Sequence, residues 1–190
     1  MPERFAHALN ILALFAISGI LLFAFYDQFV GGDLPCPLCL LQRVGFCIVG
    51  AGLALNVIFG PSARHYGLMI LGAVVGGAVA LRQVALHVVP GTGAYGDPVF
   101  GLHFYTWAFI VFALVLVGAG IMLVFRPRPG IGGSFRSPMG LLATVLFFLV
   151  AFGNGVSTLA ECGTGLCPDN PTSYEGYEAL MERWADRSAN

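Results

Sequence analysis

Long apolar stretches alternate along the chain with short connections that contain proline or polar residues. A bilayer core of about 30 Å takes about 20 apolar helical residues to cross. Five stretches reach or approach this length: 8–26, 39–59, 66–89, 104–125 and 139–160. Prolines fall in the connections, where helices are expected to stop: Pro61, Pro90, Pro98, Pro127, Pro129 and Pro138. The pattern predicts an all-α polytopic membrane helix bundle.

Two features of the apolar stretches refine this prediction. The first stretch could be a cleaved signal peptide, since Arg4 suits the charged start of one. However, the apolar run exceeds the usual length of about 7–15 residues and no A-x-A site follows it, so we expect a retained helix. In the third stretch, Gly72 and Gly76 form a GxxxG pattern, which favours close contact between membrane helices.

The C-terminal residues 161–190 differ from the apolar stretches, and we expect them to form a tail beside the bundle of residues 1–160. Apolar side chains recur there at helical spacing, on the face opposite to the acidic ones: Tyr174, Tyr177, Leu180, Met181 and Trp184. This pattern is typical of a short amphipathic helix that lies on the membrane and contacts lipid. An acidic, partly ordered tail is the alternative.

The composition excludes most water-soluble functions. Hydrophobic residues make up 57% of the 190 residues, charged residues only 10%, and the mean hydropathy is +0.83. Soluble domains carry about 25% charged residues. So little charge excludes a soluble enzyme, a nucleic-acid binder and a disordered chain. The formal net charge of −1 also predicts no bulk attraction to anionic partners.

The basic residues orient the predicted bundle, and all nine of them are arginines. Five lie at the N-terminus or after the second and fourth spans, positions that share one side: Arg4, Arg64, Arg126, Arg128 and Arg136. The connections on the other side, residues 27–37 and 90–103, contain neither lysine nor arginine. The positive-inside rule therefore predicts a cytoplasmic N-terminus. The C-terminus would then lie on the outer side of the membrane.

Four of the five cysteines form two closely spaced pairs on the predicted outer side. Cys36 and Cys39 open the second span as a CxxC motif, whereas Cys162 and Cys167 follow the fifth span on what we expect to be a flexible loop. An oxidising compartment favours a disulfide in each pair. A helix N-terminus makes a CxxC competent for thiol exchange, although each pair could also be a structural clip. Cys47 is expected to be a small apolar core residue.

Two arginines lie inside predicted spans, where a charge costs about 2.5–3.5 kcal/mol. Arg43 follows Cys39 by one helical turn, and Arg82 lies near the outer end of the third span. Either could snorkel to the headgroups. Together beside a dithiol, they favour a polar site for a lipid-soluble molecule with carbonyl oxygens, and a quinone fits because it accepts two electrons. His87, nearer the surface, is either part of this site or an interfacial histidine.

The residues Leu34 to Arg43, LPCPLCLLQR, resemble the corresponding motif of the DsbB family of bacterial disulfide-generating membrane proteins. Leu81 to Val84, LRQV, is a second and weaker match near the outer end of the third span. With the order of the spans, the resemblance covers roughly the first 125 residues. It implies a four-helix DsbB-like core, to which this chain adds a fifth transmembrane helix and a short amphipathic outer helix.

The resemblance also implies a function for each site residue. Cys36 and Cys39 would pass electrons to ubiquinone or menaquinone, with Cys39 nearer to the quinone. Arg43 would hold the quinone and stabilise negative charge on it, Arg82 would support the same site, and His87 is the candidate for the family's histidine near the end of the third span. The partner would be a thioredoxin-fold periplasmic dithiol oxidase.

The chain departs from the family pattern in two places. The family usually carries a second cysteine pair between the third and fourth spans, where residues 90–103 have none, and it usually ends after four spans. We therefore hypothesise that the pair after the fifth span replaces the missing one. A partner thiolate would attack the Cys162–Cys167 disulfide, and the resulting dithiol would reduce Cys36–Cys39. The predicted activity is that of a quinone-dependent protein-disulfide oxidoreductase.

Three alternatives remain open from the sequence. The chain could be a non-catalytic DsbB-like subunit of a larger membrane complex, with two structural disulfides. It could be a transmembrane thiol reductant or resemble vitamin K epoxide reductase, although the CxxC of that enzyme lies in a late span. A zinc site is the weakest alternative, because no outer histidine has ligand spacing to the cysteines, and we predict no metal.

Overall fold

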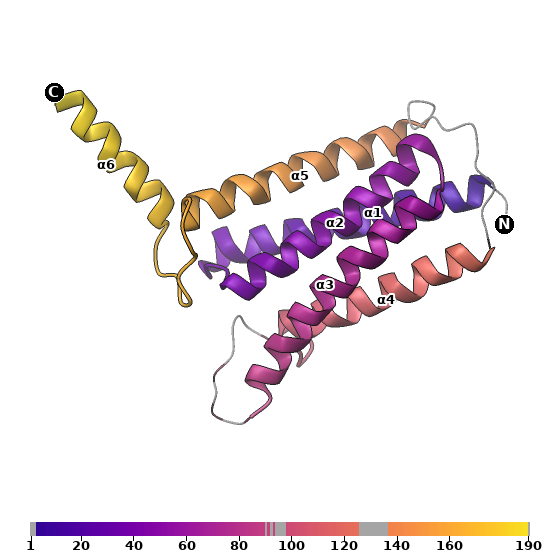
Figure 1. The fold of residues 1–190 in the computed structure, drawn as a ribbon, viewed down its shortest axis with the longest axis horizontal. Coiled ribbons are helices and arrows are strands. Elements are labelled where there is room, and N and C mark those ends of the chain that lie inside the picture. The colour runs from indigo at the N-terminus through magenta and orange to yellow at the C-terminus, as the bar shows by residue number, and fades with distance from the viewer. Residues whose placement is uncertain (1–2, 90, 92, 94–97, 126–136, 190) are drawn as a thin grey trace.

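The structure, a computed structural model, describes residues 3–89, 91, 93, 98–125 and 137–189. Five long helices run alternately up and down in one bundle (Figure 1). They are α1 (Glu3–Tyr26), α2 (Pro37–Phe59), α3 (Ala63–His87), α4 (Phe104–Phe125) and α5 (Pro138–Cys162). A π-helical turn, η1 (Asp27–Gly31), continues α1, and each of the five segments is long and apolar enough to cross a membrane. The predicted all-α polytopic bundle is confirmed.

The helix boundaries follow local signals in the sequence. α2 starts with Pro37 in its first turn and Cys36 as N-cap, and Ser62 and Ser137 cap α3 and α5 with their side chains. The predicted spans match the helices to within a few residues, with one consequence for the chemistry. Because α5 extends to Cys162, this cysteine is the last residue of a helix, and the prediction that it lies on a flexible loop was wrong.

Close packing of α2, α3 and α4 builds the core of the bundle. α2 packs most extensively on α3, and α3 on α4, while α5 packs on α1 and α2. Phe112 of α4 stacks on Phe46 of α2, with ring centroids 4.1 Å apart, and its ring occupies the space that a Cβ on Gly76 would need. A Cβ on Gly72 would lie 2.8 Å from Cγ2 of Ile48. The GxxxG pattern therefore marks a close helix contact, as predicted.

A buried polar network connects α1, α2 and α3 at the end of the bundle where the chain passes from α2 to α3. The Asn10 side chain donates to the Tyr66 hydroxyl at 3.0 Å, and the Asn56 side chain donates to Oδ1 of Asn10 at 3.0 Å. Oδ1 of Asn56 accepts from the backbone N–H of Ser62 at 3.0 Å. Since buried polar groups are costly when unpaired, this network fixes α1, α2 and α3 relative to one another.

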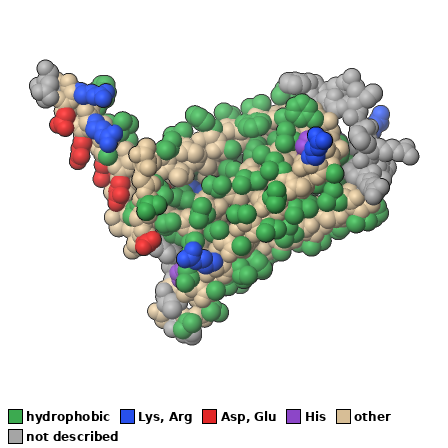
Figure 2. All heavy atoms as spheres, in the orientation of Figure 1, with side chains coloured by type: hydrophobic (Ala, Val, Ile, Leu, Met, Phe, Trp, Pro, Cys, Tyr) green, Lys and Arg blue, Asp and Glu red, His purple; other side chains and the backbone are tan. Residues whose placement is uncertain are grey.

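The surface of the bundle is dominated by hydrophobic side chains, as expected for helices that face lipid (Figure 2). Acidic side chains gather instead along α6 (Glu175–Ala189), which projects away from the end of α5 (Figures 1 and 2). α6 begins close against α5, because a Cβ on Gly176 would collide with the Leu159 carbonyl and with Gly163. The predicted short C-terminal helix is confirmed, and its contact with lipid stays a prediction.

The connection of residues 126–136, which carries Arg126, Arg128 and Arg136, lies outside the described residues. Pro90, Pro127 and Pro129, at which helices were predicted to stop, lie outside them as well. The chain is a multi-pass membrane protein, and the side of the membrane that each end faces stays a prediction.

Candidate functional site

The CxxC motif forms the first turn of α2. Cys36 has an extended backbone, and its sulfur accepts a hydrogen bond from the backbone N–H of Cys39 at 3.2 Å. Pro37 suits the first helical position because its fixed φ is helical and no N–H is needed there. Cys36 is buried, whereas Cys39 is partly exposed. Both are free thiols, so of the two disulfides expected from the sequence the structure contains only Cys162–Cys167.

The two thiols of the motif differ in their surroundings. The side-chain contact with the Cys39 thiol and, secondly, burial raise the pKa of the Cys36 thiol above its ordinary value, whereas the backbone N–H of Cys39 acts in the opposite direction. Cys36 therefore holds its proton more tightly than an ordinary thiol does. Cys47, farther along α2, packs against the apolar core as expected.

A glutamine of α3 contacts both sulfurs. The Gln83 side chain has no exposed surface, and its amide nitrogen lies 3.4 Å from Sγ of Cys36 and 3.6 Å from Sγ of Cys39. The side-chain amide of Gln42 donates to Oε1 of Gln83 at 2.6 Å, which orients the Gln83 amide with its N–H donors toward the thiols. Sulfur is a better acceptor as a thiolate than in a disulfide, because charge strengthens hydrogen bonds. The arrangement favours the reduced pair.

Arg43 lies one turn below Cys39 and is held from the side of α1. Its guanidinium donates to Oε1 of Gln28 at 2.7 Å and to the Ala24 carbonyl at 3.0 Å, and it lies 5.9 Å from the centre of the Phe25 ring. These contacts fix the cation beside the CxxC. The electrostatic partners of Arg43 include Cys39, so the cation can stabilise a thiolate there.

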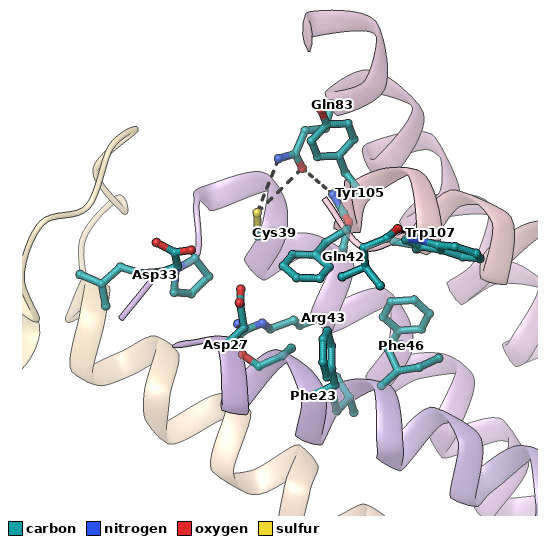
Figure 3. A pocket seen from close by; sticks show the side chains of 18 of the residues that line it. Phe23, Asp27, Asp33, Cys39, Gln42, Arg43, Phe46, Gln83, Tyr105 and Trp107 are labelled. Atoms are coloured by element: carbon teal, nitrogen blue, oxygen red, sulfur yellow. Dashed lines mark hydrogen bonds between the residues drawn. The ribbon is translucent and has the colours of Figure 1, made fainter. Parts of the chain in front are cut away.

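A cavity of about 800 Å³ opens beside these residues, between α1, α2 and α4 (Figure 3). Cys39, Arg43 and Gln83 lie on its wall, and aromatic side chains cover much of the rest. Figure 3 shows Arg43 and Asp27 close together, with Phe23 below them, Phe46 to the right, and Tyr105 and Trp107 of α4 above and to the right. The cavity walls further include Ala16, Ile20, Leu34, Phe100, Phe104, Ala108 and Val111.

Of the residues predicted to bind the quinone, Arg82 and His87 do not line this cavity. Arg82 is exposed, because successive residues of a helix point about 100° apart and its neighbour Gln83 takes the inward position. His87 donates from Nδ1 to the Gln83 carbonyl oxygen at 2.8 Å and stacks on Tyr105 with ring centroids 5.3 Å apart. The structure thus brings Gln83 to the dithiol in place of Arg82, with His87 one turn farther out.

The segment that carries the C-terminal cysteines borders the same cavity. Asn170, Pro171 and Thr172, which follow Cys167, line the cavity together with Cys39. Behind them, the Gln28 amide nitrogen donates to the Ser157 hydroxyl at 2.8 Å and to the Tyr174 hydroxyl at 3.0 Å. The fifth helix and the tail are therefore connected to Arg43 through one side chain, Gln28.

Sequence reasoning missed the three glutamines that order this site: Gln28, Gln42 and Gln83. Gln42 and Gln83 each stand next to an arginine in otherwise apolar segments, and the charge of the arginine is the stronger signal in the sequence. An uncharged amide in an apolar helix is itself a sign of a buried polar contact. Among the described residues, no cluster of three or more histidine, cysteine or acidic side chains could hold a metal ion.

Comparison with known proteins places these residues in a family. The family described as "Disulfide bond formation protein DsbB" matches residues 6–95. Disulfide bond formation protein B of Chromobacterium violaceum is 42% identical over 79 residues, which cover 40% of this chain and 48% of that protein. The protein of the same name from Xanthomonas axonopodis pv. citri is 33% identical over 117 residues, covering 58% of this chain and 68% of the relative. The chain belongs to the DsbB family.

The resemblance inferred from the CxxC motif is thereby confirmed. The CxxC, Arg43 and Gln83 all fall within the DsbB match, whereas α5 and the C-terminal cysteines lie beyond it. The chain spans about half the length of the first relatives that it matches, 48% and 49%. No solved structure matches it significantly.

Proposed function

We propose that this DsbB-family protein oxidises the dithiol of a thioredoxin-fold periplasmic partner and passes the electrons to a membrane quinone. The observation that carries the proposal is the cavity of about 800 Å³ with Cys39, Arg43 and Gln83 on its wall and the tail segment at its border. The protein would lie in the bacterial inner membrane, with its N-terminus in the cytoplasm and the cysteines on the periplasmic side.

The cavity suits a quinone headgroup in both shape and chemistry. Phe23, Phe46 and Trp107 supply flat apolar surface, and Arg43 and Gln42 supply N–H donors of the kind that bind carbonyl oxygens. A quinone supplies a two-electron, two-proton acceptor that dissolves in the bilayer. Ubiquinone and menaquinone share the two carbonyl groups, so both fit these donors.

The residues of α2 and α3 would carry out the quinone half of the reaction. Cys39, the partly exposed sulfur on the cavity wall, is the electron donor, and the buried Cys36 closes the disulfide behind it. Arg43 stabilises negative charge first on the Cys39 thiolate and then on the acceptor. Gln83 orients both sulfurs, and His87 holds the end of α3 at the Gln83 carbonyl.

The C-terminal pair would carry out the partner half. Cys162 is buried at the end of α5, whereas Cys167 is partly exposed, so Cys167 is the sulfur that a partner thiolate reaches. Attack on Cys167 releases Cys162 as a thiolate and gives a mixed disulfide between the partner and Cys167. The second partner thiol resolves this bond, and the Cys162–Cys167 dithiol then reduces Cys36–Cys39 by exchange.

The test is thiol-dependent quinone reduction by the purified protein. Cys39→Ala is expected to abolish this activity, because no donor sulfur remains at the cavity, whereas Cys47→Ala should retain it. With a partner dithiol as electron source, the double variant Cys162→Ala, Cys167→Ala is expected to lose turnover as well. Persistent activity of Cys39→Ala would refute the assignment. A wild-type protein that reduces no quinone would favour the alternative of a non-catalytic subunit in a larger membrane complex.

A further inference from the structure

Glu161 of α5 is a buried acid with no role in the function proposed so far. Its side chain has no exposed surface, and neither carboxylate oxygen has a hydrogen-bond partner among the described residues. An unpaired carboxylate in an apolar setting is strongly disfavoured, and acidic residues inside membrane helices usually have a functional reason. Glu161 also stands next to Cys162, the last residue of the same helix.

The surroundings of Glu161 connect it to the redox pair. Glu161 interacts electrostatically with Arg43 and with Cys39, both on α2. Arg43 donates to Gln28, and Gln28 donates to Ser157, which precedes Glu161 by one helical turn on α5. One buried polar cluster thus contains the thiol that loses electrons, the cation beside it and a carboxyl group.

Other ionisable groups near Arg43 interact with it less strongly. Of its acidic partners, Cys39 and Glu161 interact most strongly with it, ahead of Asp27 of η1 and Tyr174 before α6. Asp27 is partly exposed and lines the cavity beside Arg43 (Figure 3). Cys162 is held in its disulfide and does not titrate.

We propose that Glu161 exchanges a proton whenever Cys36–Cys39 changes redox state, so that the negative charge that Cys39 and Glu161 together present to Arg43 stays constant. In the reduced site, Cys36 is a thiol, Cys39 is a thiolate and Glu161 is a neutral acid. On oxidation, an S–S bond forms between Cys36 and Cys39, and two electrons leave. The Cys36 proton and the Glu161 proton leave with them, and Glu161 becomes the carboxylate that faces Arg43.

The charges and protons balance in both directions. The two electrons and two protons pass to the quinone of the proposed function, which becomes the quinol. Cys36, Cys39 and Glu161 together carry one negative charge before and after. In the return step, the C-terminal dithiol supplies two electrons and two protons, one to Cys36 and one to Glu161, and becomes a disulfide again. Constant charge matters here because a net change of charge in a dry site is costly.

The proposal rests on the proposed function only in that Cys36 and Cys39 cycle between a dithiol and a disulfide. The experiment is a redox equilibrium of the detergent-purified, quinone-free protein with dithiothreitol, between pH values of about 6 and 7.5, below the ordinary thiol pKa of about 8.5. Alkylation and peptide mass spectrometry report the Cys36–Cys39 pair separately from the C-terminal pair. This readout does not depend on turnover.

The expected results follow from proton counting. In the wild type, dithiothreitol gives up two protons and the site takes up two, so the equilibrium constant for reducing the site is independent of pH. In Glu161→Gln the site takes up only one, so the constant rises about tenfold per pH unit. Glu161→Asp retains a carboxyl group and should restore independence of pH, and the exposed Glu182→Gln should behave as the wild type.

Infrared difference spectroscopy between the reduced and oxidised proteins gives a second readout. The wild type should lose a protonated-carboxyl band on oxidation, and Glu161→Gln should lack this change. The same pH dependence in wild type and Glu161→Gln would overturn the proposal while leaving the proposed function intact. A Cys36–Cys39 pair that does not cycle in either protein would overturn both.

Discussion

Gln83→Met tests the idea that the α3 glutamine sets the redox equilibrium of the CxxC. Gln83 is fully buried, and its amide nitrogen lies 3.4 Å from Sγ of Cys36 and 3.6 Å from Sγ of Cys39. Methionine has a similar length and removes both donors. Because a thiolate accepts more strongly than a disulfide, the substitution should destabilise the reduced pair more than the oxidised pair.

The expected magnitude follows from the two contacts. A typical hydrogen bond contributes about 0.5–1.5 kcal/mol net, and sulfur contacts of this length belong in the lower half of that range. Two of them give about 1–2 kcal/mol, which is a factor of about 5–30 in an equilibrium constant. For a two-electron couple this corresponds to about 20–45 mV. The Cys36–Cys39 disulfide of Gln83→Met should be harder to reduce by this amount.

The assay is equilibration with mixtures of reduced and oxidised dithiothreitol at one pH, followed by alkylation of free thiols and mass spectrometry of the peptide with Cys36 and Cys39. Leu86→Met, an exposed position on the same helix, is the matched control and should leave the equilibrium unchanged. Loss of the Gln42 contact affects both redox states equally and cancels in this comparison. If Gln83→Met folds and keeps the wild-type equilibrium constant, the amide does not favour the reduced pair and the reasoning fails.

Three further variants test other parts of the structure. Arg43→Met should raise the KM for quinone about 10- to 100-fold, since a hydrogen bond from a charged donor contributes about 1.5–3 kcal/mol. Arg82→Met should raise the KM less, because Arg82 is exposed. Equal effects of the two variants in steady-state kinetics would contradict this placement. When the partner is added in its disulfide form, Cys162→Ser should accumulate a mixed disulfide between Cys167 and the partner, visible on non-reducing gels. Cys167→Ser should not accumulate one. The reverse pattern would make Cys162 the attacked sulfur. Gly76→Ala should lose about 1–3 kcal/mol of stability through overpacking against Phe112, while Gly118→Ala, whose Cβ would meet no atom within 4 Å, should not; matching melting temperatures in detergent would refute the close contact.

The sequence by itself determined the bundle and the place of the CxxC. Membrane helices can be recognised locally, because each needs about 20 apolar residues in succession, and prolines mark the connections between them. The second apolar stretch, predicted as residues 39–59, placed Cys36 and Cys39 at its mouth without knowledge of any other helix, and in the structure α2 begins at Pro37. Arg43 followed from them by helical spacing alone.

Only the tertiary structure decided which side chains meet across helices. Arg82 and Gln83 are neighbours in sequence, and which of them faces the thiols depends on the rotation of α3 about its axis against α2. That rotation is set by contacts such as Gly76 with Phe112, which lie far apart in the chain. A pattern of apolar residues all around a helix does not encode this angle, because in lipid every face can be apolar.

The same reason applies to α5 and the tail. The sequence indicated a fifth span and a second cysteine pair, and it placed Glu161 beside Cys162. It did not indicate that α5 packs on α1 and α2, or that Gln28 connects Ser157 to Arg43. Glu161 of α5 is coupled electrostatically to Arg43 and Cys39 only because α5 packs on α2, and the order of residues along a chain does not fix that packing.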